Sequence, residues 1–257
     1  ARGEFIAVLD ADDLMHPERL ARQVGFLDAH PEIGALGSSL AVFGSKSEEW
    51  HWPETDEEAR GKLLFSDPVC YGTAMFRARV LRDSGVRCDE QWLTPGMDFL
   101  FVMSLAPYLR YANIPEPLTY YRVGEQNMRH GTDAYESRAR IYRRQFELFG
   151  IPAGEEEVRL QLMLHRLFRQ VPEAHDVGAL VKWIERLKSI NRERRIFTVH
   201  VFEQELDRRF SRLFHPLADA SASAAFAHLR ARRTLNWPDA RYLMAAWFRR
   251  RRLTAMS

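Results

Sequence analysis

Residues 5–13 read Phe-Ile-Ala-Val-Leu-Asp-Ala-Asp-Asp, an apolar run that ends in a cluster of carboxylates. A continuous run of this kind is typical of a strand that is buried on both faces in the middle of a parallel sheet. Open α/β sheets bind ligands at the carboxyl ends of such strands, where the loops diverge into a crevice. The stretch therefore predicts an α/β fold with a ligand site at Asp10 and Asp12.

The residues that follow predict a strand–helix–strand unit. Pro17 and Pro31 bracket a helix over about residues 17–29, with apolar positions at Leu20, Val24 and Leu27. Residues 33–43 are rich in β-formers and small side chains and predict a returning strand. The β-α-β alternation favours parallel strands.

Further along the chain, helices are expected at 57–65, 77–84 and about 98–107, and a strand at 71–76. Two short β segments, 111–114 and 118–123, are separated by prolines at 115 and 117. From residue 132 onward the periodicity is mainly helical and indicates four to six helices. We therefore expect two domains, 1–130 and 131–257.

The composition indicates which binding partners and which cellular compartment to expect. The 37 basic and 35 acidic side chains give a net charge of +2, too small for a broad nucleic-acid footprint. Two cysteines cannot form a disulfide framework or a four-cysteine zinc site, so a reducing, cytoplasmic location is expected. The four arginines 249–252 follow Trp247 and Phe248. They indicate either peripheral contact with anionic lipid or a solvated helix end.

The two carboxylates Asp10 and Asp12 have a spacing that suits a metal. In extended backbone, residues two apart point to the same side, and their like charges repel unless a cation or a shared proton relieves them. One or two carboxylates together with substrate phosphates are the ligands that Mg²⁺ or Mn²⁺ uses, so a diphosphate is the natural partner. For Asp13 we expect only a role in the turn or in capping the next helix.

Several motifs in a fixed order extend this interpretation. They are Arg-Gly-Glu-Phe-Ile-Ala-Val-Leu-Asp-Ala-Asp-Asp at 2–13, Pro-Glu-Arg-Leu at 17–20, Gly-Thr-Ala-Met-Phe-Arg at 72–77, Gly-Met-Asp-Phe-Leu at 96–100 and Pro-Leu-Thr-Tyr-Tyr-Arg at 117–122. Together they closely resemble the middle of family 2 glycosyltransferases with the GT-A fold, over about residues 1–130. Haloacid-dehalogenase-type phosphatases also begin with an apolar strand followed by Asp-x-Asp. Here, however, Leu14 stands where that family usually has Thr or Val, and no later Gly-Asp-x-x-x-Asp follows.

The resemblance implies a partial GT-A fold, Rossmann-like with a mostly parallel sheet, followed by a helical C-terminal region. By this resemblance, Asp12 coordinates a divalent metal, Mn²⁺ or Mg²⁺, that bridges the donor diphosphate, and Asp10 contacts the nucleotide ribose or the metal shell. Asp98 is the general base. The implied reaction transfers a sugar, with inversion, from a nucleotide-sugar donor to a saccharide or other hydroxyl acceptor in polysaccharide or glycoconjugate synthesis.

The sequence departs from the family pattern in three places. Met97 replaces the usual acid before Asp98, and Gly124 stands where many relatives have a His ligand that His130 or Asn127 would have to replace. The strands that normally precede residue 1 are absent from this sequence, so we expect a truncated chain that does not turn over nucleotide sugar by itself. Two alternatives stay open: Asp98 acts as a helix N-cap, or the chain is a non-catalytic binding or scaffold module.

Overall fold

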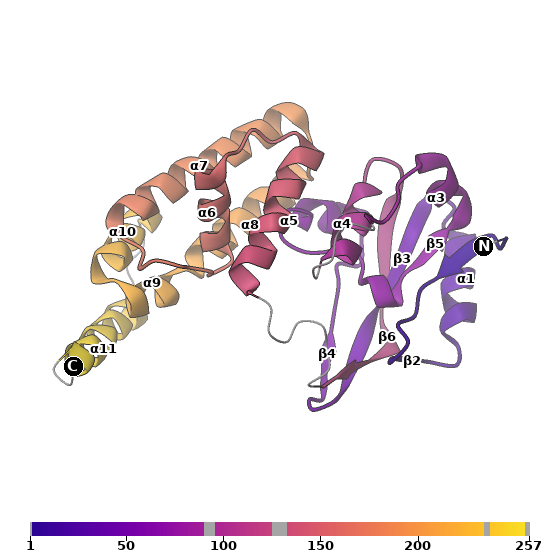
Figure 1. Ribbon diagram of the computed structural model, residues 1–257, viewed down its shortest axis with the longest axis horizontal. Helices are drawn as coiled ribbons and strands as arrows, with labels where there is room; N and C mark the ends of the chain where they lie inside the picture. The colour runs from indigo at the N-terminus through magenta and orange to yellow at the C-terminus, as the bar shows by residue number, and fades with distance from the viewer. Residues whose placement is uncertain (1, 90–95, 125–132, 234–236, 255–257) are drawn as a thin grey trace. The chain divides into compact units, whose positions relative to one another are not determined.

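The computed structural model describes residues 2–89, 96–124, 133–233 and 237–254, with side chains up to residue 246. Within it the chain divides into two compact units, Ala1–Thr132 and Asp133–Ser257. Figure 1 shows that the strands lie in the first unit and that the second is built from helices. The expected α/β fold followed by a helical C-terminal region is confirmed.

The first unit contains one sheet and a small set of helices. Its elements in chain order are β1 (Phe5–Ala7), β2 (Leu14–Met15), α1 (Arg19–Ala29), β3 (Ile33–Gly44), β4 (Glu48–Trp50), α2 (Asp56–Lys62), the 3₁₀ helix η1 (Tyr71–Thr73), β5 (Met75–Arg77), α3 (Ala78–Ser84), α4 (Met97–Ser104) and β6 (Arg110–Val123).

The sheet is mixed, and this corrects the expectation of a mostly parallel one. Its strands follow the order β1-β5-β3-β6-β2, with β4 paired to β3, and among the pairs described only β3 and β6 run parallel. The β-α-β alternation predicted the direction of successive strands, but β5 enters antiparallel between β1 and β3. The direction of β5 follows from its pairing with β1 and β3, which are distant in sequence, and local periodicity does not report such pairing.

Strand β1 is also less buried than the sequence predicts. Phe5 and Ile6 are half-buried and Ala7 is exposed, because β1 pairs with one described neighbour, β5, at the end of the strand order. The strand stops at Ala7, so Val8 and Leu9 belong to the connection that follows, and Val8 N donates to Ala74 O at 2.9 Å.

Strand β6 runs as a single element through both prolines, where two separate segments were predicted. Proline has no N–H to donate to a sheet ladder, so a central strand tolerates it only at an irregularity. The register of β6 against β3 shifts between Ser38, which faces Ile114, and Ser39, which faces Pro117. This bulge places Pro115 where no ladder bond is required.

Helix α1 packs on the sheet with a face that differs from the predicted one. Its buried positions are Arg19, Gln23 and Leu27, spaced four residues apart, whereas Leu20 is 43% exposed. Leu27 joins the core of the first unit, which also contains Ile33, Leu36, Met75, Ala112, Ile114 and Leu118. Two polar residues thus occupy the part of α1 that lies nearest the end of β1.

In the second unit, the described elements are all helices. They are α5 (Ala134–Phe149), α6 (Glu155–Leu164), α7 (Ala174–Arg194), α8 (Val199–Ser211), α9 (Phe214–Ala220), α10 (Ala222–Arg232) and α11 (Trp237–Thr254), one more than the upper expectation of six. Helix α6 ends at Leu164, and Arg166 shortly beyond it adopts a positive φ of 61°, which cannot continue a right-handed helix.

No helix among the described residues combines the length and the apolar content needed to cross a bilayer. The aromatic and basic side chains 247–252, on which the predicted lipid contact depends, lie outside the described side chains.

Candidate functional site

The predicted site residues lie in a turn between β1 and β2. Asp13 N donates to Asp10 O at 3.2 Å, which closes the turn. The expectation that Asp10 and Asp12 share one side of an extended strand is therefore wrong, because β1 has already ended. The turn nevertheless keeps the two carboxylates close enough that the charge of Asp12 raises the pKa of Asp10, after the larger effect of burial.

Asp13 fastens this turn to the sheet. Its carboxylate is 7% exposed, and Oδ1 accepts a hydrogen bond from the backbone N of Arg122 in β6 at 2.9 Å. The Arg122 side chain in turn donates a hydrogen bond from Nε to the backbone O of Asp12 at 3.0 Å. Asp13 does not cap α1, whose N-cap is Glu18. Its predicted role in the turn fits this geometry, and β6 therefore holds the turn in place.

Arg19 is a structural residue that sequence reasoning missed. It is fully buried, and its guanidinium donates from Nη2 to Val8 O at 2.8 Å and from Nε to Gln23 Oε1 at 3.0 Å. Burial lowers the pKa of Arg19 to about 10, and the nearby Asp13 carboxylate opposes this shift. At neutral pH the side chain is thus a buried cation beneath the acidic turn. Arg19, Gln23 and Leu27 are spaced four residues apart and therefore share one face of α1. This spacing was the signal in the sequence that could have placed Arg19 beside the buried Leu27.

Asp98 approaches the same place from α4. The N-cap of this helix is Gly96, with φ of 112°, and Asp98 lies in the first turn with no capping hydrogen bond from its side chain. The alternative in which Asp98 serves as the N-cap is therefore wrong. The charge of Asp98 raises the pKa of Asp10, after burial and Asp12. The fold thus brings Asp98 within electrostatic range of Asp10, although the two are far apart in sequence, whereas Asp12 is only two residues from Asp10.

The η1 segment packs against two carboxylates of this acidic group. A Cβ added to Gly72 would lie 3.2 Å from Asp10 Oδ2 and 3.8 Å from Asp13 Oδ2, so the backbone here passes directly against the two carboxylates. Thr73 Oγ1 donates to Cys70 O at 3.0 Å and accepts from Ser38 N at 3.1 Å, which fixes the segment to β3. Burial raises the pKa of Cys70 to about 12, so its thiol stays protonated.

The donor set suits a hard divalent cation held partly by substrate. Among the described residues, no group of three or more His, Cys, Asp or Glu side chains is arranged to hold a metal. Two carboxylates are sufficient where phosphate oxygens and water complete the coordination shell. The repulsion that raises the pKa of Asp10 is what a cation would relieve. His130 and Asn127, the expected substitutes for a third ligand, lie outside the described residues.

The crowding of carboxylates predicts that Asp10→Asn stabilises the metal-free protein. Because the pKa of folded Asp10 is raised, its ionisation opposes folding once the pH exceeds that raised value, and the opposition disappears at lower pH. Solvent screening at this exposed side chain limits the gain in unfolding free energy to about 1 kcal/mol or less at pH 7. Urea denaturation at pH 7 and at pH 3, in EDTA, measures it. Equal stability of both proteins at pH 7 would contradict the prediction.

Comparison with known proteins shows which family shares these features. Residues 1–85, from β1 to the end of α3, match the model of glycosyl transferase family 2. The matched segment contains Asp10, Asp12, Asp13, Arg19 and the η1 segment, and Asp98 lies beyond it.

Two curated relatives and one solved structure illustrate the similarity. The chain is 25% identical over 142 residues to the amylovoran biosynthesis glycosyltransferase AmsE of Erwinia amylovora, covering 54% of this chain and 53% of the relative. It is 34% identical over 82 residues to the putative glycosyltransferase EpsE of Bacillus subtilis, covering 32% and 30%. The chain thus spans about half the length of the first relative.

The solved structure is that of Staphylococcus aureus TarS residues 1–349 in complex with UDP-GlcNAc, which aligns with a TM-score of 0.44 at 18% identity. The alignment covers 98% of this chain and 69% of that one.

Proposed function

We propose that the chain, whose residues 1–85 match the model of glycosyl transferase family 2, is part of a glycosyltransferase that moves a sugar from a nucleotide-diphosphate sugar to an acceptor hydroxyl. The observation that carries the proposal is the electrostatic influence of Asp12 and Asp98 on Asp10, at a place where the Gly72 backbone passes against the Asp10 carboxylate. The name of the amylovoran relative supports a role in polysaccharide biosynthesis.

In the proposed mechanism, Asp12 and Asp10 would hold a divalent cation, Mn²⁺ or Mg²⁺, against the donor diphosphate. When bound, this ion would neutralise charge that gathers on the leaving group. Asp13 and Arg19 hold the turn that presents the two carboxylates. They act as positioning residues and need not contact substrate.

Asp98 is proposed as the general base. It would remove the proton from the acceptor hydroxyl as the oxygen attacks the anomeric carbon. Attack from the face opposite the leaving diphosphate inverts the anomeric configuration. The first turn of α4 suits this task, because the positive end of the helix dipole stabilises the carboxylate.

Loss of nucleotide binding in Asp12→Ala tests the proposal. With Mn²⁺ present, we expect the Kd for UDP or GDP to rise at least about tenfold in the natural full-length protein, because removing one charged ligand typically weakens binding by 1.4 kcal/mol or more. The Asp12 side chain is exposed and its backbone O accepts the Arg122 bond, so the turn should persist. Isothermal titration calorimetry measures the change.

Asp28→Ala is the matched control, since Asp28 is an exposed carboxylate on α1. Its Kd should equal that of the wild type. Nucleotide binding that is independent of metal and unaffected by Asp12→Ala would favour a non-catalytic scaffold.

A further inference from the structure

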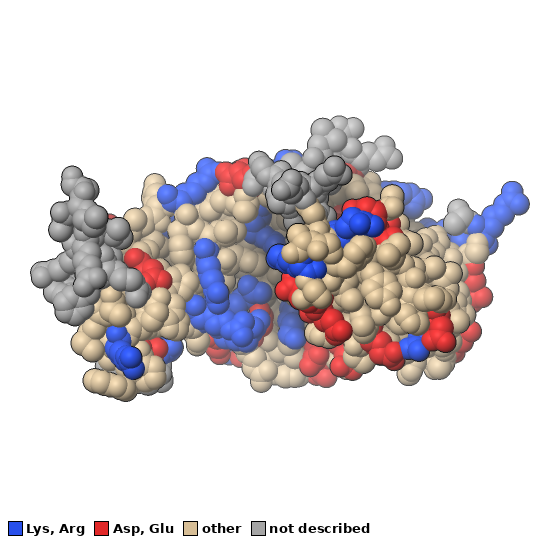
Figure 2. All heavy atoms as spheres, turned by 90° about the horizontal axis from the view of Figure 1, so that it is seen from below, with Lys and Arg blue, Asp and Glu red and all other residues tan. Residues whose placement is uncertain are grey.

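The helical unit contains a strongly cationic pocket that the proposed transfer reaction does not use. In the view of Figure 2, Lys and Arg side chains gather over this unit. The pocket has a volume of about 300 Å³ and is lined by Leu164, His165, Arg166, Arg208, Arg209 and Arg212. Small-molecule sites span roughly 300–1,000 Å³ and are mostly apolar. This one is small, and four of its six lining side chains are permanently charged.

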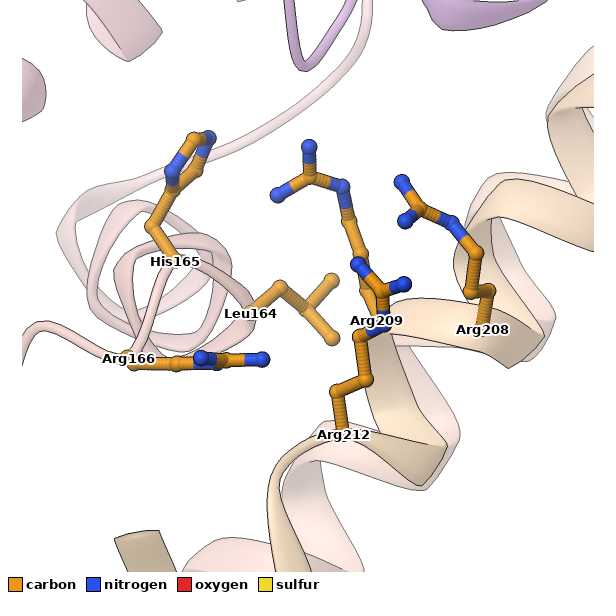
Figure 3. Close-up of a pocket in the computed structure, with 6 residues that line it drawn as sticks. All are labelled: Leu164, His165, Arg166, Arg208, Arg209 and Arg212. Carbon is orange, nitrogen blue, oxygen red and sulfur yellow. The ribbon is translucent and has the colours of Figure 1, made fainter. Parts of the chain in front are cut away.

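Two helix ends bring these arginines together. Helix α6 ends at Leu164 with His165 as C-cap, and the positive φ of Arg166 turns the chain there. Helix α8 ends at Ser211 with Arg212 as C-cap, one turn beyond Arg208. Figure 3 shows the guanidinium groups of α8 on one side of the pocket and that of Arg166 extending toward them from the other side.

Among the ion pairs described, the negative charge beside the pocket is smaller than the positive charge of its arginines. Glu205, with a side chain 4% exposed, pairs with Arg208 at 2.6 Å and with Arg209 at 2.5 Å. Each helix C-terminus adds roughly −0.5 of a charge. Setting Glu205 and the two helix ends against four arginines leaves about +2 on the lining. An ordinary helix-dipole interaction therefore accounts for only part of this cluster.

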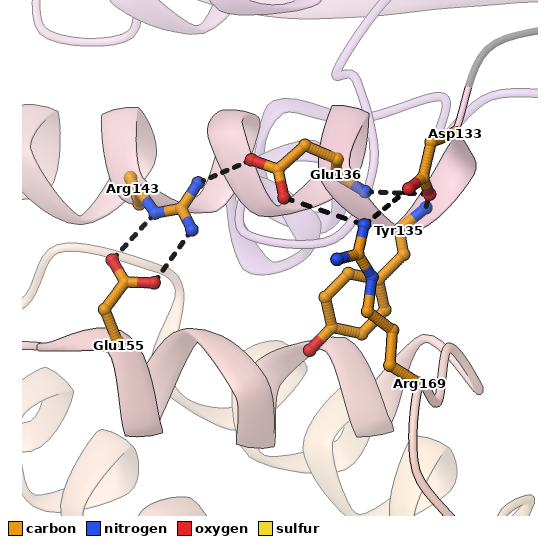
Figure 4. A network of polar contacts seen from close by, with 6 residues as sticks. All are labelled: Asp133, Tyr135, Glu136, Arg143, Glu155 and Arg169. Atoms are coloured by element: carbon orange, nitrogen blue, oxygen red, sulfur yellow. Dashed lines mark hydrogen bonds and ion pairs between the residues drawn. The ribbon is translucent and has the colours of Figure 1, made fainter.

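Other arginines in the same unit are paired with carboxylates that balance their charge. Figure 4 shows Arg143 held by both oxygens of Glu155 at 2.8 Å and by Glu136 at 3.1 Å. Arg169 pairs with Asp133 and lies over the ring of Tyr135. By contrast, neither Arg166 nor Arg212 forms an ion pair with a carboxylate of the described residues. Their guanidinium groups are available to an external anion.

His165 adds a polar, uncharged group to this wall. Burial and the nearby charges of Arg138 and Arg209 lower the pKa of His165 to about 2, so the ring is neutral at physiological pH. Its Nε2 atom is buried without a hydrogen-bond partner among the described residues. The ring therefore adds no positive charge, and the cationic character of the lining comes from its arginines.

We infer that this pocket is a binding site for a phosphate group, held by Arg166, Arg208, Arg209 and Arg212 across the ends of α6 and α8. Guanidinium groups recognise phosphate oxygens through paired, charge-assisted hydrogen bonds, and a phosphate dianion matches the excess charge of about +2. The site is independent of the proposed transferase function, because it contains none of the acidic residues of the first unit.

Titration of inorganic phosphate into the full-length protein tests this inference. We expect saturable binding in EDTA at low ionic strength and an increase in Kd of at least about tenfold in Arg166→Gln/Arg212→Gln, which removes two charged donors. Arg166→Lys/Arg212→Lys keeps the charge but loses the fork geometry and should bind with intermediate affinity. The double variant Arg230→Gln/Arg241→Gln removes the same charge from exposed positions of the unit and should bind as the wild type does. Circular dichroism verifies that each variant is folded.

Additional titrations identify the source of the phosphate group. They also distinguish the phosphate-site inference from the proposed transferase function. Glycerol 3-phosphate represents a soluble phosphomonoester, and vesicles with phosphatidic acid represent a lipid headgroup. Whichever binds should lose affinity in the Gln double variant. Asp12→Ala should leave phosphate binding unchanged. Absence of saturable binding to the wild type, or equal binding by the two Gln double variants, would overturn the inference.

Discussion

Replacing Asp98 with Asn is expected to lower kcat by roughly 10²–10⁴-fold in the full-length enzyme, while the Kd for the donor nucleotide stays within about twofold. The amide has nearly the same shape as the carboxylate but cannot accept the acceptor proton. Since Gly96 provides the N-cap of α4, the substitution removes only a favourable charge from the first turn, worth about 0.3–1 kcal/mol of stability. The fall in kcat would therefore not reflect unfolding.

The experiment separates chemistry from binding by measuring kcat and donor Kd on the same preparations. Asp83→Asn on α3 is a suitable control, because its exposed carboxylate pairs only with Arg79 among the contacts described, at 3.2 Å between Oδ2 and Nε. That variant should retain wild-type turnover. Unchanged kcat in Asp98→Asn would remove Asp98 from the mechanism, although Asp10 and Asp12 could still bind the donor.

The sequence predicted the location of the acidic cluster better than its geometry. The apolar run before Asp10 indicated a strand followed by a ligand turn, and this depends only on local hydrophobicity. Whether β1 is central or at the end of the described sheet depends on which strands pair with it, and such pairing is non-local. For the same reason, Asp98 could be proposed from a motif, but its approach to Asp10 could not be derived from spacing.

The polar face of α1 was missed for a different physical reason. Hydrophobic periodicity assigns Leu20 to the core and Arg19 to solvent, since an isolated buried cation is unfavourable. In the structure, Arg19 can be buried because the Val8 carbonyl, just after β1, and the Gln23 amide oxygen accept its hydrogen bonds. Binary patterning has no term for a buried charge that donates to specific acceptors. The arginine pocket on α8 was missed similarly, because its lining comes from two helices.

Arg19→Met is expected to reduce the free energy of unfolding by about 3–5 kcal/mol. Methionine fills similar space but donates no hydrogen bond, so the Val8 carbonyl and the Gln23 amide oxygen lose charged donors in a buried setting. The buried carboxylate of Asp13 also loses a nearby cation. Urea denaturation should show a lower midpoint with an unchanged slope.

The control is Arg22→Met, one turn further along the same helix. Arg22 is an exposed arginine paired with Glu18 at 2.7 Å and with Glu116, and surface pairs of this kind contribute little to stability. The contrast between the two variants isolates the effect of burial from that of charge. If Arg19→Met unfolds at the same urea concentration as Arg22→Met, the buried guanidinium does not anchor the acidic turn. If the predicted loss is observed, the turn that carries Asp10 and Asp12 depends on a cation beneath it, and donor affinity should fall together with stability.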